Sequence, residues 1–169
     1  VYCSQNGYRE DDFNPYVWKS IDNGKTWKSI AGDLPAECIN TVREDPVKKD
    51  ILWVGTDMGV YVSTDGGKHW DTFGGGLPHT PVHDLAIQPK AKEMVIASHA
   101  RSVWAVSTEP VYDLSEEIKA AESYFWTTSD INWSDRWGYN VRGEWDKNDP
   151  QEPQVTIKFY TSLRGSGQV

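Results

Sequence analysis

The residue types best suited to acid–base or anion-binding chemistry lie between positions 57 and 101 of the chain. Asp57 and Asp84 carry carboxylates, His83 and His99 carry imidazoles, and Arg101 carries a permanent positive charge. Imidazoles and carboxylates transfer protons, and guanidinium groups bind anions. We therefore take the two aspartates as candidate catalytic residues, and the two histidines with the arginine as candidate binding residues.

The spacing of the reactive residues indicates no metal, cofactor or covalent intermediate. His79 and His83 lie in a segment that contains Pro81, so they do not form the helical pair typical of zinc ligands. The sequence contains no Gly-x-Ser-x-Gly nucleophile motif and no phosphate-binding glycine loop. We expect neither a metal nor a cofactor.

The composition excludes two classes of partner. The 169 residues carry a formal net charge of −8, which opposes binding to the phosphates of nucleic acid. No run of about 18 apolar residues occurs, so no membrane span is expected. Cys3 and Cys38 are too few for a disulfide-rich scaffold, and either one disulfide or two small apolar thiols fits the sequence.

An internal repeat organises the first two thirds of the chain. The stretch Ser20–Trp27 returns as Ser63–Trp70, with Asp22 and Asp65 standing 43 residues apart. The same offset relates Leu34-Pro35 to Leu77-Pro78. Alternating apolar residues predict four strands in one unit, at about 38–45, 51–56, 60–64 and 69–73. Four strands in about 40–45 residues are typical of a β-propeller blade.

The repeated motif carries a resemblance to a known family. The pattern Ser-x-Asp-x-Gly-x-Thr-Trp, the Asp-box or BNR repeat, is complete at 20–27, and at 63–70 only His69 departs from it. The chain resembles sortilin-like, bacterial "glycosyl hydrolase, BNR repeat" propellers over about residues 8–110. The runs at 82–87 and 100–104 resemble the closing blade of that family, although Ala100 stands where the family often has glycine.

The Asp-box residues are expected to be structural. Their aspartate should accept hydrogen bonds from turn N–H groups, their glycine should adopt positive φ, and their tryptophan should be buried against neighbouring strands. The resemblance places these boxes on the rim, away from the active face. The structural set comprises Ser20, Asp22, Gly24, Trp27, Ser63, Asp65, Gly67 and Trp70.

The predicted fold is all-β, and three regions follow from it. Residues 1–109 hold an outer strand pair at 16–30, one whole blade, and three strands at 82–107. These amount to about two blades, whereas a closed propeller has about four to eight. We therefore predict part of a larger propeller, which packs against its remainder or against other chains.

Beyond the propeller we predict a connector and the start of a second module. Residues 110–150 hold a short helix at 114–122, opened by a capping box from Asp113 to Glu116, and a connector with four tryptophans. These tryptophans either stack on sugars or, in the interpretation we favour, hold the connector on the propeller. Residues 151–169 begin with a strand at 153–160, where the resemblance implies an immunoglobulin-like module.

Two functions from different classes remain. Propeller topology gathers the loops at 35–37, 57–58, 79–83 and 99–101 on one face. The leading hypothesis is a non-catalytic binding or scaffold propeller, secreted, periplasmic or at the cell surface, whose loop face binds a protein or glycan. The alternative is a glycoside hydrolase of the sialidase or xyloglucanase kind, with most of its catalytic residues in blades outside this part of the protein. Such an enzyme needs two carboxylates about 5–10 Å apart, and only Asp57 and Asp84 were identified on this face.

Overall fold

The computed structural model describes residues 1–74, 76–99, 102–128, 131, 155 and 157–162. The chain divides into two compact units, Val1–Asp113 and Leu114–Val169, which are described separately here. None of the helices in the described residues has the length and apolarity needed to span a membrane.

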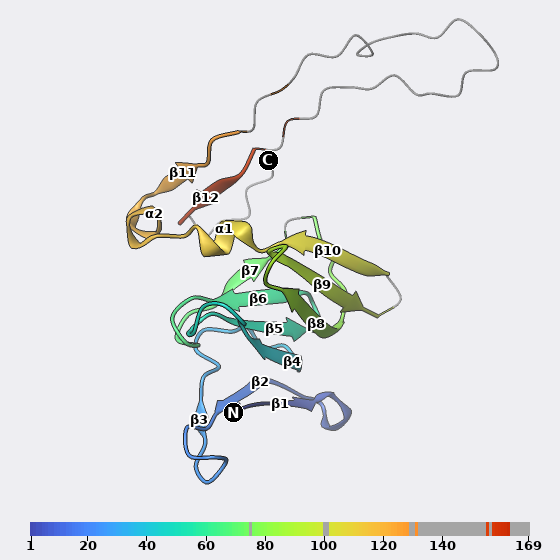
Figure 1. The fold of residues 1–169 in the computed structure, drawn as a ribbon. Coiled ribbons are helices and arrows are strands. Elements are labelled where there is room, and N and C mark those ends of the chain that lie inside the picture. Colours follow the sequence, from blue (N-terminus) through green and yellow to red (C-terminus); the bar gives the residue numbers. More distant parts are fainter. Residues whose placement is uncertain (75, 100–101, 129–130, 132–154, 156, 163–169) are drawn as a thin grey trace, which may run out of the picture. The chain divides into compact units, whose positions relative to one another are not determined.

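Three antiparallel sheets make up the first unit (Figure 1). The first contains β1 (Tyr2–Gly7), β2 (Asp12–Lys19) and β3 (Lys28–Ser29), with a 3-10 turn at Tyr8–Glu10. The second contains β4 (Ile39–Glu44), β5 (Leu52–Thr56), β6 (Val60–Ser63) and β7 (Asp71–Phe73) in that order. The third contains β8 (Val82–Gln88), β9 (Glu93–Ser98) and β10 (Val103–Ser107). The four-stranded blade and the three strands at 82–107 are thereby confirmed.

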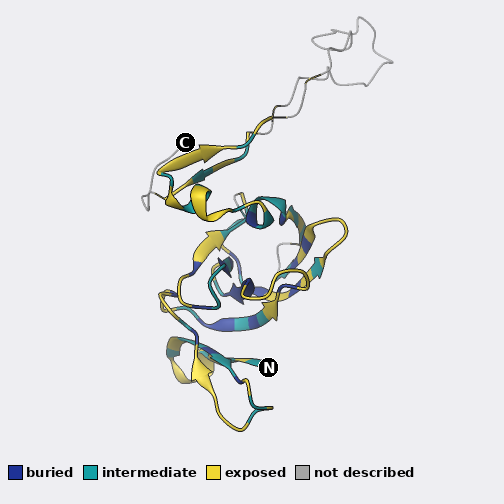
Figure 2. Ribbon diagram, turned by 60° about the vertical axis from the view of Figure 1, so that its left-hand side comes forward, coloured by how far each residue is buried: buried dark blue, intermediate teal, exposed yellow. Residues whose placement is uncertain are grey.

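The second sheet is buried on both faces. Leu52 and Val54 of β5 join an apolar cluster with Val17 of the first sheet. Trp53, pointing to the opposite face, joins a cluster with Leu85 and other residues of the third sheet. Successive side chains of a strand point to opposite faces of its sheet, and here each face packs against another sheet. All of β5 is therefore buried (Figure 2).

A glycine in β5 sets how closely the second and third sheets approach. A Cβ atom on Gly55 would lie 2.7 Å from a methyl group of Val82 and 2.9 Å from its carbonyl oxygen. Because both sheets meet at this point, any side chain here would force them apart. Gly55 therefore lets β5 lie close to Val82 of β8.

The first sheet has one strand more than the predicted pair. β1 pairs with β2 in antiparallel register, from Tyr2 opposite Lys19 to Gly7 opposite Asp12. The Val1 nitrogen also donates to the carbonyl of Ser20, and the Ser20 N–H donates to the carbonyl of Val1, both at 2.9 Å. The Ser-Gln-Asn run at positions 4–6 has no apolar alternation, so the periodicity could not indicate a strand there.

A short helix, α1 (Glu109–Tyr112), ends the first unit. The sequence pattern ended the strands at Pro110 but did not indicate this helix. Pro110 occupies its first turn, where a missing N–H has no cost. Val111 is buried and joins the apolar cluster between the second and third sheets, so α1 contributes to the propeller core.

The second unit contains α2 (Glu116–Ala120), β11 (Ser123–Phe125) and β12 (Phe159–Thr161). The cap of α2 is Ser115, whose hydroxyl accepts from the N–H of Ile118, so the predicted cap at Asp113 was wrong by two residues. Lys119 pairs with Glu116 within the helix, at 2.9 Å. β12 pairs with β11 in antiparallel register. Of the predicted strand at 153–160, the described residues Phe159 and Tyr160 belong to β12, residues 155, 157 and 158 are not in a strand, and residues 153, 154 and 156 lie outside the described residues. Three of the four connector tryptophans also lie outside the described residues.

Candidate functional site

The two Asp-box hairpins share one hydrogen-bond pattern. The Ser20 hydroxyl accepts from Gly24 N–H at 2.8 Å and donates to Asp22 at 2.8 Å. Ser63 repeats both contacts with Gly67 and Asp65, at 2.8 and 2.9 Å. Gly24 and Gly67 have φ of 86° and 92°, as predicted. These hairpins are closed turns in which the serine and the aspartate serve the backbone.

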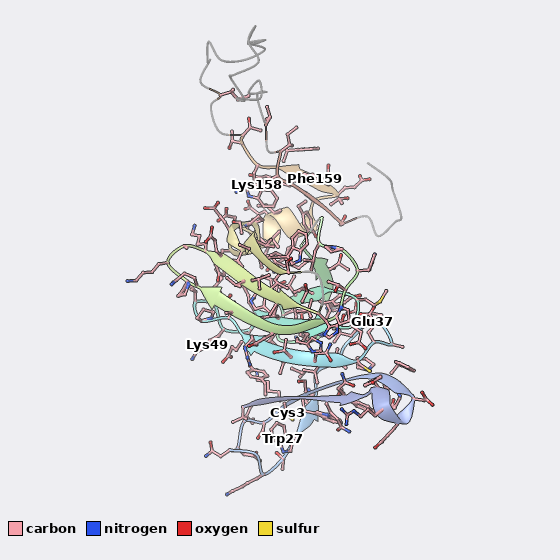
Figure 3. All side chains as sticks on the ribbon, turned by 90° about the vertical axis from the view of Figure 1, so that its right-hand side faces the viewer. Cys3, Trp27, Glu37, Lys49, Lys158 and Phe159 are labelled. Atoms are coloured by element: carbon pink, nitrogen blue, oxygen red, sulfur yellow. The ribbon has the colours of Figure 1, made fainter. Side chains whose placement is uncertain are left out.

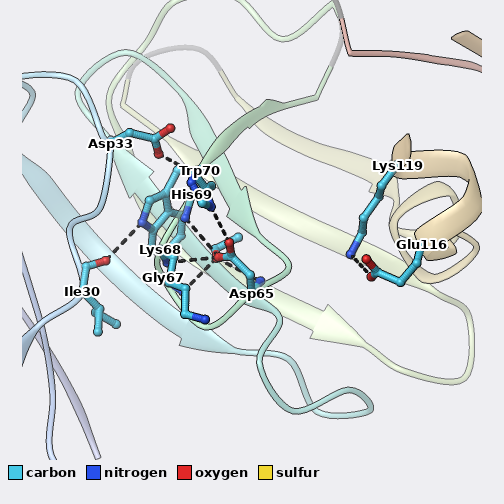
Figure 4. A network of polar contacts seen from close by, with 10 residues as sticks. Ile30, Asp33, Asp65, Gly67, Lys68, His69, Trp70, Glu116 and Lys119 are labelled. Carbon is cyan, nitrogen blue, oxygen red and sulfur yellow. Dashed lines mark hydrogen bonds and ion pairs between the residues drawn. The ribbon is translucent and has the colours of Figure 1, made fainter. Parts of the chain in front are cut away.

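His69 replaces the motif threonine without loss of the contact. In the first box the Thr26 hydroxyl donates to Asp22 Oδ2 at 2.6 Å. In the second box the His69 ring nitrogen Nδ1 lies 2.6 Å from Asp65 Oδ2, and the His69 N–H donates to Oδ1 at 3.0 Å (Figure 4). The one departure from the motif is therefore conservative in hydrogen bonding.

Hydrogen bonding lowers the pKa of both Asp-box carboxyl groups to about 2. For Asp22 the largest cause is the Thr26 hydroxyl, followed by the Thr26 N–H and the Ser20 hydroxyl. For Asp65, burial acts in the opposite direction, and the hydrogen bonds from His69, Ser63 and Lys68 outweigh it to lower the pKa. Both groups are held as carboxylates, which suits turn anchors and does not suit a general acid.

These lowered pKa values make the hairpins sensitive to acid. A carboxyl group whose pKa is lower in the folded chain stabilises it above the unfolded value of 3.8, and this contribution disappears as the pH falls through 3.8 toward about 2. We expect Asp65→Asn to be less stable than the parent chain at about pH 6, and the gap to shrink as the pH falls to about 2. Urea unfolding of both chains across this range measures it. A gap that is constant with pH would contradict the assignment.

On the loop face, two β-bulges present the side chains. The register between β4 and β5 shifts between Ile39 and Thr41, and that between β8 and β9 shifts between Val82 and Asp84. These bulges lie at equivalent points of the repeat, 43 residues apart. Each inserts one unpaired residue, Asn40 in one sheet and His83 in the other.

The second sheet uses its bulge residue to hold Asp57. The Asn40 side-chain amide donates to Asp57 Oδ1 at 2.9 Å. Its carbonyl oxygen accepts from the Asn6 amide at 2.5 Å. Asp57, which is half-buried, therefore ends a chain of amides that links β1 to the turn after β5.

Asp84 is held by an arginine from the neighbouring sheet. Arg43 of β4 pairs with Asp84 Oδ1 at 2.6 Å, and the same oxygen accepts from Leu85 N–H at 2.8 Å. Arg43 also donates from Nε to the Leu85 carbonyl at 3.2 Å. Both side chains of the ion pair are about half exposed. The sequence did not indicate this pair, because its members are 41 residues apart and meet only when β4 and β8 are adjacent.

His83 and His99 meet on the third sheet, as the loop positions predicted. Their rings are 5.5 Å apart between centroids, with planes at 69°, and both side chains are exposed. The two segments that carry them are joined by hydrogen bonds from the Thr80 hydroxyl to the His99 carbonyl and from the His99 N–H to the Pro81 carbonyl. Arg101, the third predicted binding residue, lies outside the described residues.

Glu37 is a third carboxylate on the loop face that the sequence analysis missed. It accepts from the Thr56 hydroxyl at 2.6 Å and from the Tyr61 hydroxyl at 3.0 Å. Burial, with the charge and hydrogen bond of Glu37, raises the pKa of Tyr61 to about 12. The available signal was the loop at 35–37, which follows a Leu-Pro pair repeated at the 43-residue offset.

The cysteines are both free thiols in the structure. Cys3 is exposed and Cys38 is buried, so the disulfide alternative is not formed. Burial, and secondarily the nearby carboxylate of Asp57, raises the pKa of the Cys38 thiol. Within the described part of the chain, no group of three or more His, Cys, Asp or Glu side chains is arranged to hold a metal ion.

Comparison with known proteins identifies the family. The Sortilin-Vps10 family model, described as sortilin, neurotensin receptor 3, matches residues 15–163. The chain belongs to the Sortilin-Vps10 family. This agrees with the Asp-box propeller inferred from the repeated hairpins, and the three packed sheets are propeller sheets of this family.

Solved structures and curated proteins add less. A crystal structure of an ancestral GH74 enzyme matches at 24% identity with a TM-score of 0.46. The match covers 53% of the chain described here and 11% of the enzyme's chain. No curated protein matches the sequence.

Proposed function

We propose that this chain is part of a non-catalytic propeller that binds a protein or glycan partner through its loop face. The observation that carries the proposal is that both candidate catalytic aspartates are held by neighbouring side chains. Asp84 is paired with Arg43, and Asp57 accepts from Asn40. In this proposal the two carboxylates shape the face and do not perform proton transfer.

The chemistry of glycoside cleavage supports this reading. A glycosidase needs one of its two carboxyl groups protonated, so that it donates a proton to the leaving oxygen. Asp84 Oδ1 accepts from a guanidinium and from a backbone N–H, and such charge-assisted contacts hold the side chain in place. The Glu37 carboxylate likewise accepts two hydroxyl groups. All three carboxylates are thus engaged by polar groups of neighbouring residues.

The remaining exposed groups of the face suit recognition. The His83 and His99 pair is exposed next to the exposed Asp84 carboxylate, and Met58 is 48% exposed at the turn after β5. Imidazoles donate and accept hydrogen bonds, and a methionine adapts to varied surfaces. Because sortilin-type propellers are typically extracellular, we further propose a secreted, periplasmic or cell-surface location and a ring completed by further blades.

Hydrolysis assays on the full-length natural protein test the proposal. We expect no release of reducing sugar from xyloglucan and no release of sialic acid from sialylated oligosaccharides. Activity that Asp57→Asn or Asp84→Asn abolishes, while His79→Ala leaves it unchanged, would overturn the proposal in favour of a glycoside hydrolase. The His79 variant is the matched control, since that residue is also exposed on the loop at 79–83.

A further inference from the structure

A groove of about 680 Å³ lies between the two Asp-box hairpins, and Trp27 lines it. This volume falls within the range of about 300–1,000 Å³ that is typical of small-molecule sites. The two motif tryptophans differ in exposure, since Trp70 is 4% exposed and Trp27 is 44% exposed. The expectation that both rings are buried was therefore wrong for Trp27, which lies at the edge of the first sheet (Figure 3).

Buried backbone contacts between the hairpins form the floor of the groove. Ile30 and Gly67 are both buried, and both line the groove. A Cβ atom on Gly67 would lie 2.8 Å from the Ile30 carbonyl oxygen, and the Trp70 indole N–H donates to the same oxygen at 3.1 Å (Figure 4). The two hairpins are thus already in contact, so a ligand does not have to order the groove in order to bind.

Three lysines line the groove, and two of them face each other directly. Lys19 of β2 is opposite Lys28 of β3 in the antiparallel register. Like charges in such a directly opposed pair destabilise a sheet. Lys68, which is exposed, reaches the same groove from the second hairpin. None of the ion pairs within the described residues involves these three lysines.

The repeat does not require two facing lysines. At the offset of the repeat, the equivalent residues of the second sheet are Val62 and Asp71, which are also directly opposite each other. A sheet of this type therefore forms without the repulsion between Lys19 and Lys28. Residues that cost stability in this way are typical of functional sites.

The groove also carries groups that suit the neutral parts of a sugar. The exposed Trp27 ring offers a flat apolar surface for the C–H face of a pyranose. Asp50 is exposed in the lining, and its carboxylate can accept hydrogen bonds from sugar hydroxyl groups. Asp65, which also lines the groove, is engaged by Ser63 and His69 of its own hairpin.

We infer that the groove between the two Asp-box hairpins binds an acidic oligosaccharide built from hexuronic acid units. Lys19 and Lys28 bind the carboxylate of one unit, and this removes the repulsion between them. Lys68 binds a second carboxylate from the other hairpin, and Trp27 packs on a sugar ring. None of the described residues of the four loop-face segments lines the groove. The inference therefore holds whether the loop face binds a partner or cleaves a glycan.

Calorimetric titration of the full-length natural protein with the linear trimer of galacturonic acid tests the inference. Maltotriose is the neutral trisaccharide control. We expect the acidic trimer to bind saturably, with an affinity that falls as salt is added, and maltotriose not to bind. Lys28→Gln should raise the Kd about fivefold, and Lys28→Gln combined with Lys68→Gln about 20-fold. Lys28→Arg keeps the charge and should keep the binding.

Lys25→Gln is the matched control variant. Lys25 is the exposed equivalent of Lys68 in the first hairpin and is not part of the groove lining, so this variant should leave the Kd unchanged. Equal weakening by Lys25→Gln and Lys28→Gln would overturn the inference, because binding would then follow overall charge. Absence of binding by the acidic trimer, or equal binding of maltotriose, would overturn it as well.

The free protein gives a second readout that does not depend on the chosen sugar. Lys28→Gln removes one of the two facing charges and should therefore raise the midpoint temperature of thermal unfolding. Lys25→Gln, which has no such partner in the strand register, should change it little. A midpoint temperature that falls for Lys28→Gln would show that this lysine supports the fold, and would contradict its role in binding an anion.

Discussion

Trp70→Ala is expected to lower the free energy of unfolding of the propeller unit by about 3–5 kcal/mol, the range for a large buried side chain. Trp70 belongs to the apolar cluster between the first and second sheets, with Val17, Leu52 and Val54. The substitution leaves a cavity there and deprives the Ile30 carbonyl of its indole donor. Urea unfolding followed by circular dichroism measures the loss.

Trp27→Ala is the matched control for Trp70→Ala, because it removes the same side chain from the same motif. We expect it to cost about 1 kcal/mol or less in the 169-residue chain, since the ring is exposed there. Should Trp70→Ala fail to fold, Trp70→Phe retains most of the apolar volume and should cost about 1–2 kcal/mol for the lost hydrogen bond. Equal costs for the two alanine variants would contradict the role assigned to Trp70.

The sequence predicted those parts of the fold that depend on short-range pattern. Alternation along 51–56 and 60–64 and the Asp-box turns located β5, β6 and their neighbours to within two residues. The repeat then carried the assignment from one sheet to the next. The alternation pattern did not predict β1, because that strand is defined by its hydrogen bonds to β2 and not by alternating apolar residues.

In the candidate site, too, the sequence predicted the positions of some residues and missed the contacts between others. Propeller topology predicted that His83 and His99 lie close together, because the position of each residue in its strand or loop places it on the same face. It could not reveal that Asn40 holds Asp57 or that Arg43 holds Asp84, since these contacts depend on how bulged inner strands sit side by side. The exposure of Trp27 was not predicted for a related reason: the motif specifies its own turn, whereas the segments that pack on the turn decide whether its ring is buried.

Asp45 illustrates a residue whose importance only the structure reveals. Asp45 directly precedes Pro46, and an Asp-Pro pair is typical of an ordinary turn. The repeat gives no further signal, because the equivalent position of the third sheet is Gln88. Yet Asp45 is 5% exposed and its carboxylate accepts four hydrogen bonds. One oxygen accepts from Val47 N–H and Lys48 N–H, both at 2.9 Å. The other accepts from the Trp53 indole at 3.1 Å and the Tyr112 hydroxyl at 2.8 Å.

Asp45→Asn is therefore expected to destabilise the propeller unit by about 2–3 kcal/mol, although it changes the shape of the side chain very little. Its amide group must face either the indole N–H of Trp53 or the two backbone N–H groups, and each choice leaves buried donors unpaired. Tyr112→Phe removes a single donor from the same carboxylate and should cost only about 1 kcal/mol.

The Asp45→Asn variant also has a spectroscopic readout. Burial raises the pKa of Tyr112, and the hydrogen bond to the Asp45 carboxylate raises it further. Without the carboxylate, the pKa of Tyr112 should fall while remaining above its ordinary value, because burial of the side chain against the apolar cluster still raises it. Ultraviolet titration of tyrosinate, with Tyr112→Phe to assign the signal, follows this change. An unchanged titration together with unchanged stability would show that Asp45 does not join α1 to the turn after β4.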